Sequence, residues 1–157
     1  MNISDLLAPN AVLAALKTQN KKHLLQELAA RATVMTGLPE RRIFETLVER
    51  ERLGTTGVGQ GVAIPHGRLA DVSTIYGMFA QLDTPVDYGA VDNQPVDLVF
   101  MLLAPSGAGA DHLKALAKVS RLLRNQGTCE KLRAAKSAEA LYAILTEPSA
   151  STGAQAA

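Results

Sequence analysis

A single histidine, His66, stands between Pro65 and Gly67 in a segment that is rich in glycine. The segment from Thr56 to Arg68 reads TGVGQGVAIPHGR, and the glycines before the histidine are Gly54, Gly57, Gly59 and Gly61. Glycine lets a backbone adopt conformations closed to other residues and lets another molecule approach its N–H groups, as phosphate-binding loops require. A neutral imidazole has a free lone pair at physiological pH and can accept a phosphoryl group covalently. These residue types therefore indicate phosphate chemistry at His66.

Three arginines flank this glycine loop, Arg50 and Arg52 before it and Arg68 after it. In phosphoryl transfer a protein contributes mostly positioning and charge stabilisation, and a guanidinium can supply both. A second interpretation stays open, because residues 49–52 read ERER, which is typical of the solvated end of a helix.

The two other histidines of the chain are His23 and His112. His23 falls inside a predicted helix and is interpreted as structural. His112 falls in the first turn of another predicted helix. There it is either a cap or surface residue, or a second member of the site.

The glycine loop does not match the common nucleotide-binding patterns. The ATP-binding loop ends in Gly-Lys-Ser/Thr, whereas this chain continues with Val62 and Ala63. The dinucleotide fingerprint follows a strand and opens a helix, which is the reverse of the order predicted here. A flexible connection and a non-covalent nucleotide-binding module both stay open. So does a metal-dependent hydrolase with His66, His112 and Asp111 as ligands, although no HExxH or similar spacing supports it.

Hydrophobic periodicity predicts the elements that would position these residues. The expected strands are a short one around 11–16, VAIPH (62–66) ending at Pro65, STIYGMFAQLD (73–83) and VDLVFMLLAP (96–105), with a loop over 84–95 in which Asp87 and Asp92 are turn residues. The expected helices are one that stops at Gly37, one from Pro39 to Gly54, one capped by Asp111 and ending near Gly127, and two short ones over 128–135 and 137–145 capped by Thr128 and Ser137. This order predicts an α/β fold, a mixed β-sheet sandwiched by helices, in a single domain over 1–147 with a disordered tail over 148–157.

Composition excludes several classes of function. The 16 Lys and Arg nearly balance the 15 Asp and Glu, the net charge is +1, and no basic block is present, so nucleic acid is not an expected partner. Cys129 is the only cysteine and is interpreted as a small helix residue, which favours a reducing compartment. The longest apolar run, Leu98 to Ala104, is far shorter than the roughly 20 residues that span a membrane. No secretion signal opens the sequence, so we expect a cytoplasmic protein that is not inserted in a membrane.

Three segments of the chain resemble a known family. ERERLGTTGVGQGVAIPHGRL, LDTPVDYGAVDNQPVDLVFMLLAP and HLKALAKVSRLL are similar to the enzyme IIA domains of the bacterial phosphotransferase system (PTS), fructose and mannitol type. The resemblance covers Ser4 to Leu145, and the glycine loop with AIPHGR is its most specific signature. VDNQPVDLVF and LRAAKSAEALYAIL place the likeness closest to the nitrogen-regulatory branch.

The resemblance implies a phosphocarrier that needs no cofactor. His66 would accept a phosphoryl group from the phosphohistidine of an HPr-like or NPr-like carrier, by family expectation on Nε2. Arg50 would stabilise the phosphate, and His112 would give hydrogen-bond support to the phosphate or its neighbour. Arg68 would be an electrostatic helper, and Gly57, Gly59 and Gly61 are expected to form the phosphate loop.

The resemblance also implies what the phosphorylation is for. In the regulatory branch, partners include potassium transport systems and sensor kinases. Phosphorylation of His66 would switch their binding by placing negative charge in an apolar surface formed by Val58, Val62, Ile64 and Leu69. A sugar-specific IIA component that passes phosphate to a IIB domain is the alternative.

Overall fold

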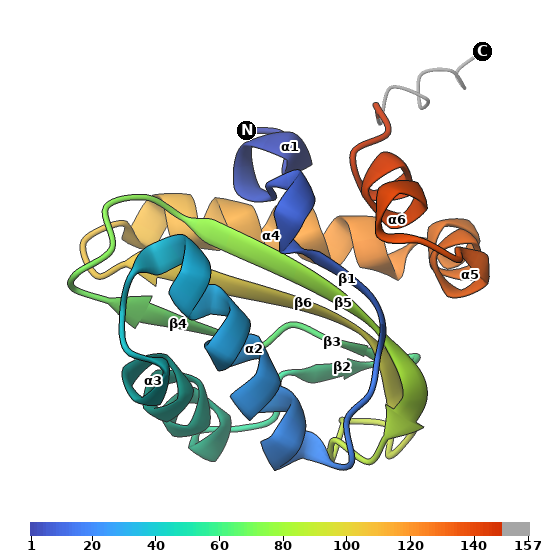
Figure 1. Ribbon diagram of the computed structural model, residues 1–157, viewed down its shortest axis with the longest axis horizontal. Coiled ribbons are helices and arrows are strands. Elements are labelled where there is room, and N and C mark those ends of the chain that lie inside the picture. The colour runs from blue at the N-terminus through green and yellow to red at the C-terminus, as the bar shows by residue number, and fades with distance from the viewer. Residues whose placement is uncertain (149–157) are drawn as a thin grey trace.

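A mixed sheet of six strands organises the computed structural model, which describes residues 1–148 (Figure 1). The strands are β1 (Val12–Leu16), β2 (Gly57–Gly59), β3 (Val62–Ala63), β4 (His66–Leu69), β5 (Tyr76–Val86) and β6 (Val96–Pro105). The sheet order is β1-β5-β6-β3-β2, and β4 pairs with the same edge of β6 as β3 does. β5 runs antiparallel to β6, whereas β1 is parallel to β5 and both β3 and β4 are parallel to β6.

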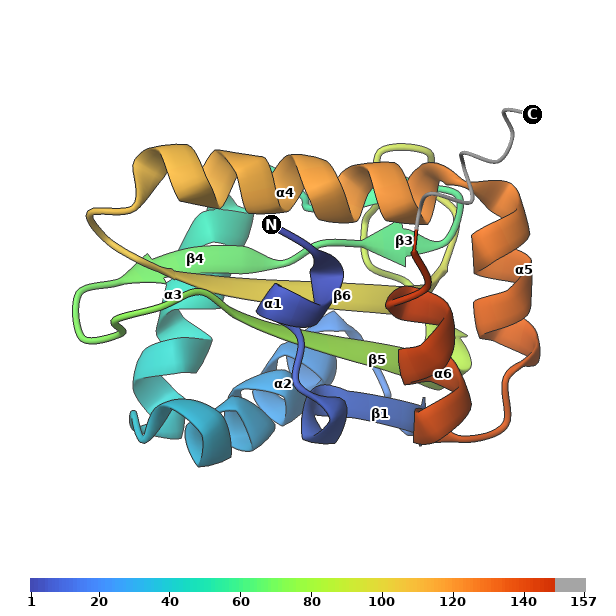
Figure 2. The ribbon, with the colours of Figure 1, turned by 90° about the horizontal axis from the view of Figure 1, so that it is seen from above.

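Helices cover both faces of this sheet, which confirms the predicted fold class. They are α1 (Ile3–Leu6), α2 (Lys21–Thr36), α3 (Glu40–Arg52), α4 (Gly109–Arg124), α5 (Gln126–Ala134) and α6 (Ala138–Leu145), with a single 3-10 turn at Pro9–Ala11. In Figure 1, α2 and α3 lie below the sheet and the other helices above it. Figure 2 shows that α4 runs along the edge formed by β3 and β4.

The central strand β6 forms the middle of the hydrophobic core. Its residues from Leu98 to Ala104 are all fully buried, as a strand covered on both faces requires. β5 packs beside it, with the rings of Phe79 and Phe100 edge to face. The apolar run that the sequence contains is therefore a buried strand, as predicted.

Local signals explain where most helices begin and end. The side chain of Asn20 accepts the N–H of His23 at the start of α2, and Gly37 ends that helix with φ of 74°. The predicted cap Ser137 is confirmed, because its side chain accepts the N–H of Ala140. The helix that Pro39 precedes, α3, also matches the prediction.

Two predicted caps are wrong. α4 begins after Ala108, because the chain turns there, with the Ala108 N–H donating to the Pro105 carbonyl. Asp111 therefore lies inside the first turn and is not the cap. α4 also ends at Arg124, since a new helix starts directly after it. The cap of this helix, α5, is Asn125, whose side chain accepts the N–H of Thr128.

The predicted boundaries of β5 are shifted. The strand begins at Tyr76 rather than Ser73, and it continues through Pro85 to Val86 into the segment predicted as loop. Proline is tolerated there because the pairing with β6 is irregular between Gln81 and Val86. Asp87 and Asp92 are exposed turn residues, as predicted.

Within residues 1–148, no helix combines the length and the apolar character needed to cross a bilayer. Apart from Pro148, the predicted tail over 148–157 lies outside the described residues.

Candidate functional site

His66 stands at a break in the strand that borders β6. β3 ends at Ala63, and the chain resumes pairing with β6 only at His66, the first residue of β4. In the gap, the Ile64 N–H donates to the Thr56 carbonyl instead of to the sheet, and Pro65 has no N–H to donate. The prediction of one strand that runs out at His66 is therefore wrong. β3 and β4 are two short strands that lie end to end along β6, and His66 is the first residue of β4.

The break also determines which nitrogen of the His66 ring carries the proton. Nδ1 lies 2.8 Å from the carbonyl oxygen of Ile64. A carbonyl can only accept, so Nδ1 must be the protonated nitrogen that donates. The lone pair is therefore on Nε2, which accepts from the Nε–H of Arg50 at 3.3 Å.

Arg50 reaches the ring from the last turn of α3. Its Nη1 donates to the Gly54 carbonyl at 2.9 Å, while its Nε faces the imidazole. The guanidinium is thus held between the chain that leaves α3 and the nucleophilic nitrogen. Arg52, in contrast, is exposed and pairs with Glu49 at 3.5 Å, so the solvated-helix interpretation holds for Arg52.

His112 reaches the same place from the first turn of α4, on the other layer. Its ring centroid lies 5.4 Å from that of His66, edge to face. It is 3% exposed, so the interpretation as a surface residue or cap is wrong. Arg68 donates from Nε to His112 Nδ1 at 3.3 Å. His112 Nε2 is buried and has no hydrogen-bond partner among residues 1–148.

Both rings are held in the neutral state. Burial is the largest cause that lowers the pKa of His66 below 6.5, and the cations Arg50 and Arg68 lower it further, against the opposing effects of the Ile64 carbonyl and Glu51. The pKa of His112 falls to about 4, first through burial and then through His66 and Arg68. At neutral pH the site therefore offers two uncharged imidazoles between two guanidinium groups.

Gly67 allows α3 to approach β4 closely. A Cβ atom built at Gly67 would lie 2.5 Å from Cγ2 of Thr46, in the middle of α3. No side chain fits in that gap. The absence of a side chain next to His66 thus brings the helix that carries Arg50 against the strand that carries the imidazole.

The glycines before His66 form a hairpin at some distance from it. Gly57 and Gly59 belong to β2, which pairs with β3 across a two-residue turn of Gln60 and Gly61. Both turn residues have positive φ, 57° and 80°, as a type I′ hairpin turn requires. The backbone freedom therefore serves this turn.

The hairpin turn and the imidazole align with different parts of β6. Val62, after the turn, pairs with Leu98, whereas His66 pairs with Leu102. Four residues of strand correspond to about 13 Å. The structure therefore brings Arg50, Arg68 and His112 to His66, and does not bring Gly59 and Gly61 there.

The apolar surface expected around the histidine is not present as predicted. Val62, Ile64 and Leu69 are buried in the core, at 2%, 5% and 3% exposed, and only Val58 is exposed. Strand alternation and the covering helices place the three inside. The exposed apolar side chains that adjoin site residues in sequence are Leu53, just after α3, and Leu113, next to His112.

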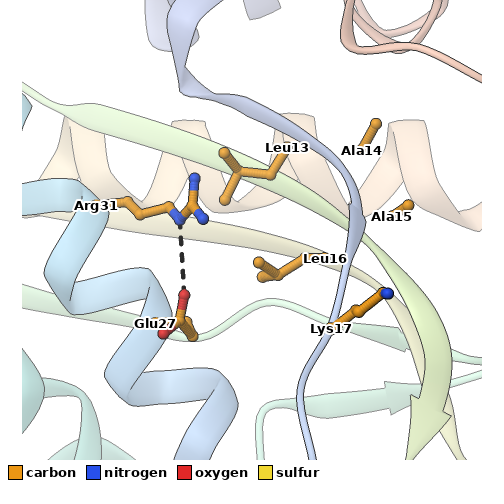
Figure 3. Close-up of a pocket in the computed structure, with 7 residues that line it drawn as sticks. All are labelled: Leu13, Ala14, Ala15, Leu16, Lys17, Glu27 and Arg31. Atoms are coloured by element: carbon orange, nitrogen blue, oxygen red, sulfur yellow. Dashed lines mark ion pairs between the residues drawn. The ribbon is translucent and has the colours of Figure 1, made fainter.

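Two cavities of the described structure lie away from the imidazole. One of about 370 Å³ lies between β1 and α2, where Arg31 pairs with Glu27 (Figure 3). Another of about 730 Å³ follows the outer face of α3, from Arg42 to Arg52. His66 lines neither of these two cavities, and its side chain is half-buried at the β4 edge.

Sequence reasoning missed Glu51. Its side chain is only 7% exposed and pairs with Lys21 at 2.9 Å, whereas the ERER pattern predicts a solvated residue. A signal was available, because Ile43, Leu47 and Glu51 are spaced by four residues and share the buried face of α3.

The chain is similar to proteins of one family along nearly its whole length. The model of the family described as "Phosphoenolpyruvate-dependent sugar phosphotransferase system, EIIA 2" matches residues 5–147. A protein of Bradyrhizobium diazoefficiens named nitrogen regulatory protein is 59% identical over 150 residues, which cover 96% of this chain and 98% of that one.

Solved structures agree with this similarity. The crystal structure of nitrogen regulatory protein IIA-Ntr from Neisseria meningitidis superimposes with a TM-score of 0.87 at 38% identity, over 92% of this chain and 99% of that one. The mannitol enzyme IIA of Escherichia coli, solved in complex with phosphorylated enzyme IIB, gives a TM-score of 0.75 at 19% identity, over 91% of this chain and 100% of that one. At that identity the second likeness concerns the fold alone.

Proposed function

Because the chain belongs to the EIIA 2 family of the phosphoenolpyruvate-dependent phosphotransferase system, we propose that it is a phosphocarrier in which Nε2 of His66 accepts a phosphoryl group. The observation that supports this most directly is the hydrogen bond from Nδ1 to the Ile64 carbonyl. It leaves the lone pair on Nε2, at a ring whose lowered pKa keeps it unprotonated. The donor in this proposal is the phosphohistidine of an HPr-like or NPr-like carrier.

The transfer step balances without a further reactant. The carrier phosphohistidine is protonated on its second ring nitrogen. The Nε2 lone pair of His66 forms a bond to phosphorus while the N–P bond of the carrier breaks, the electron pair returns to the carrier ring, which leaves as a neutral imidazole, and the positive charge passes to the His66 ring. The Nδ1 proton of His66 stays in place throughout, donated to the Ile64 carbonyl. The Arg50 guanidinium turns from the lone pair to the phosphoryl oxygens as phosphorus approaches, which stabilises their charge.

His112 and Arg68 are proposed as supporting groups. Arg68 donates to Nδ1 of His112, so Nε2 of that ring carries its proton and is a hydrogen-bond donor without a partner among residues 1–148. A phosphoryl oxygen on His66 would supply that partner after a small shift of the ring. The cation of Arg68 adds to the attraction for the phosphate.

Two exposed apolar side chains close in sequence to the site residues support a protein donor. Leu53 is 84% exposed and Leu113 64% exposed, and they follow Arg50 and His112 closely in sequence. In this proposal they offer apolar contact to a docking carrier. Phosphorylation then adds close to two negative charges at the same surface, which would repel partners of the unmodified form.

We place the protein in the nitrogen-regulatory branch, since relatives over nearly the full length are named nitrogen regulatory proteins. The partners of this proposal are of the kinds that the resemblance implies, potassium transport systems and sensor kinases. We also propose a cytoplasmic location, because the thiol of Cys129 is free and buried. A sugar-specific IIA component is the second candidate, supported by the likeness in fold to the mannitol enzyme IIA.

No observation favours a nucleotide-binding module or a metal-dependent hydrolase. The hairpin N–H of Gln60 already donates to Asp92 at 2.8 Å, so it is not free to bind a nucleotide phosphate. Residues 1–148 contain no cluster of three or more His, Cys, Asp or Glu side chains placed to hold a metal ion.

The test is the intact mass of the protein after incubation with phosphoenolpyruvate, enzyme I and an HPr-type carrier. We expect wild type and His23→Ala to gain one acid-labile phosphoryl group and His66→Ala to gain none. A fructose-type IIB domain is then added. Loss of the group to IIB would favour the sugar-specific candidate, and retention the regulatory one. No gain by wild type beside a phosphorylated carrier would refute the phosphocarrier proposal.

A further inference from the structure

Glu51 is a buried carboxylate surrounded by donors. Its side chain is 7% exposed and accepts Lys21 Nζ at 2.9 Å, the backbone N–H of Thr56 at 3.1 Å and the Tyr88 hydroxyl at 3.1 Å. The Thr56 hydroxyl donates to it as well. A buried charge is costly unless it is paired and hydrogen-bonded, and here every such requirement is met.

The groups around Glu51 also hold one another. The Thr56 hydroxyl lies 2.9 Å from the Tyr88 hydroxyl, and Lys21 lies over the Tyr88 ring at 4.4 Å. Burial and the Glu51 charge raise the pKa of Tyr88, so its hydroxyl stays protonated and donates. The cluster therefore ties α3 to the start of α2, to the segment before β2 and to the loop after β5.

From this cluster a chain of hydrogen bonds leads to the imidazole. The carbonyl of Thr56 accepts the N–H of Ile64 at 3.0 Å, and the carbonyl of Ile64 accepts Nδ1–H of His66 at 2.8 Å. The peptide groups of Thr56 and Ile64 thus stand between the carboxylate and the ring. If Thr56 moves, the carbonyl that selects the His66 tautomer moves with it.

The same segment supports the guanidinium. Glu51 binds Thr56, and its neighbour Arg50 donates to the carbonyl of Gly54 at 2.9 Å. Arg50 and Glu51 of α3 therefore form hydrogen bonds to two positions of the short segment 54–56. This arrangement orients Arg50 Nε and His66 Nε2 toward each other.

We propose that Glu51 is a positioning residue for phosphoryl acceptance, which through the backbone of Thr56 and Ile64 holds His66 in the tautomer with its lone pair on Nε2. The role rests on the proposed function of His66. Glu51 touches neither the ring nor the phosphate. It acts by keeping the acceptor for Nδ1–H in place, as the partners of metal-binding histidines do elsewhere.

The test uses Glu51→Gln in the full chain, with two readouts. The first is the pair of 15N chemical shifts of the unphosphorylated His66 ring, which report the tautomer and need no carrier. We expect the Nδ1–H tautomer to lose population. The second is the rate at which a phosphorylated carrier loads His66, which should fall about tenfold because the nucleophile is misplaced.

Asp97→Asn is the matched control for loss of a partly buried ion pair. Asp97 pairs with Arg133 at 2.9 Å, and it lies near the hairpin, away from His66. This variant should keep the wild-type tautomer and loading rate even where its melting temperature drops as far as that of Glu51→Gln.

A gentler variant, Tyr88→Phe, removes one donor from Glu51 and keeps the carboxylate. It should change the tautomer and the rate in the same direction by less, and it carries the test if Glu51→Gln does not fold. An unchanged His66 tautomer in folded variants that have lost these contacts would overturn the positioning role. If wild type is never phosphorylated, the proposed function fails, while the tautomer measurement still decides the role of Glu51.

Discussion

At the scale of single residues, the site depends on two imidazoles that burial keeps neutral and that hold different tautomers. His66 donates through Nδ1 to a backbone carbonyl, whereas His112 accepts at Nδ1 from Arg68. The same ring therefore exposes a lone pair in one case and an N–H in the other. The local partner of one nitrogen determines the chemistry of its opposite nitrogen.

This arrangement predicts how the site responds to pH. Burial, and after it Arg50, lower the pKa of His66 below 6.5, so more than half of the His66 rings are unprotonated at pH 6.5. The rate of loading should fall as the pH falls below that value, because the fraction of His66 with a free lone pair falls. Arg50→Met removes a cation and should raise the pKa of His66, whereas Glu51→Gln removes an anion and should lower it.

An NMR titration of the His66 ring measures both directions. A midpoint at or above 6.5 in wild type would contradict the burial argument. Shifts of equal sign in the two variants would contradict the charge argument.

At the scale of elements, the broken strand and the helix beside it create the site. Between β3 and β4, Pro65 interrupts the pairing of the chain with β6, and Gly67 lets α3 approach β4. The first feature places the ring, and the second places the guanidinium next to it. A regular strand would have fixed the backbone but left no outward carbonyl for Nδ1.

The contact between Gly67 and Thr46 predicts a mutation with a rescue. Gly67→Ala should destabilise the fold by about 1 to 3 kcal/mol through overpacking and slow the loading of His66, because α3 and Arg50 must retreat. Adding Thr46→Ser removes the methyl group that a Cβ would meet at 2.5 Å, and should restore much of both.

Urea unfolding and the carrier assay check this pair of variants. Gly107→Ala is the control, because a Cβ there has no atom within 4 Å. Equal losses in Gly67→Ala with and without Thr46→Ser would show that the close approach is not the reason for the glycine.

At the scale of the whole molecule, the site joins the two helical layers across the edge of the sheet. Arg50 comes from α3 below the sheet in Figure 1, His112 from α4 above it, and His66 from β4 between them. Closing the two layers buries His112 to 3% exposure. Because the buried ring must be neutral, the free energy of unfolding depends on the protonation of His112.

Acid should therefore destabilise the whole fold through His112. Its pKa drops from 6.5 to about 4 on folding. Between these pH values the imidazole is protonated in the unfolded chain and unprotonated in the folded chain. The free energy of unfolding should fall as the pH falls from 6.5 toward 4, by about 1.4 kcal/mol for each unit of pKa difference at most.

Denaturant unfolding at several pH values in this range tests the prediction. His112→Asn keeps an acceptor near the position of Nδ1 for Arg68 and does not titrate, so its slope with pH should be shallower than that of wild type. Parallel slopes would show that His112 is not responsible.

Local patterns in the sequence were enough to predict the class of fold and to single out His66 as the proposed nucleophile. The all-apolar run of β6 and the helical spacing of α2, α3 and α4 are local patterns, and local propensity and burial agree there. The missing N–H of Pro65 is an intrinsic property, so the sequence predicted an interruption there, although it did not predict the second strand that begins at His66. The family resemblance rested on the same residues.

Which side chains meet at the site depends on how distant segments pack. His112 and Arg68 pair across 44 positions, and Glu51 is bound by Lys21 from α2 and by Tyr88 from beyond β5, so no local pattern encodes these contacts. The same holds for the glycine hairpin, which sequence alone placed at the histidine. Its distance from His66 follows from pairing with β6, because the register between distant strands is settled by packing rather than by the segment itself.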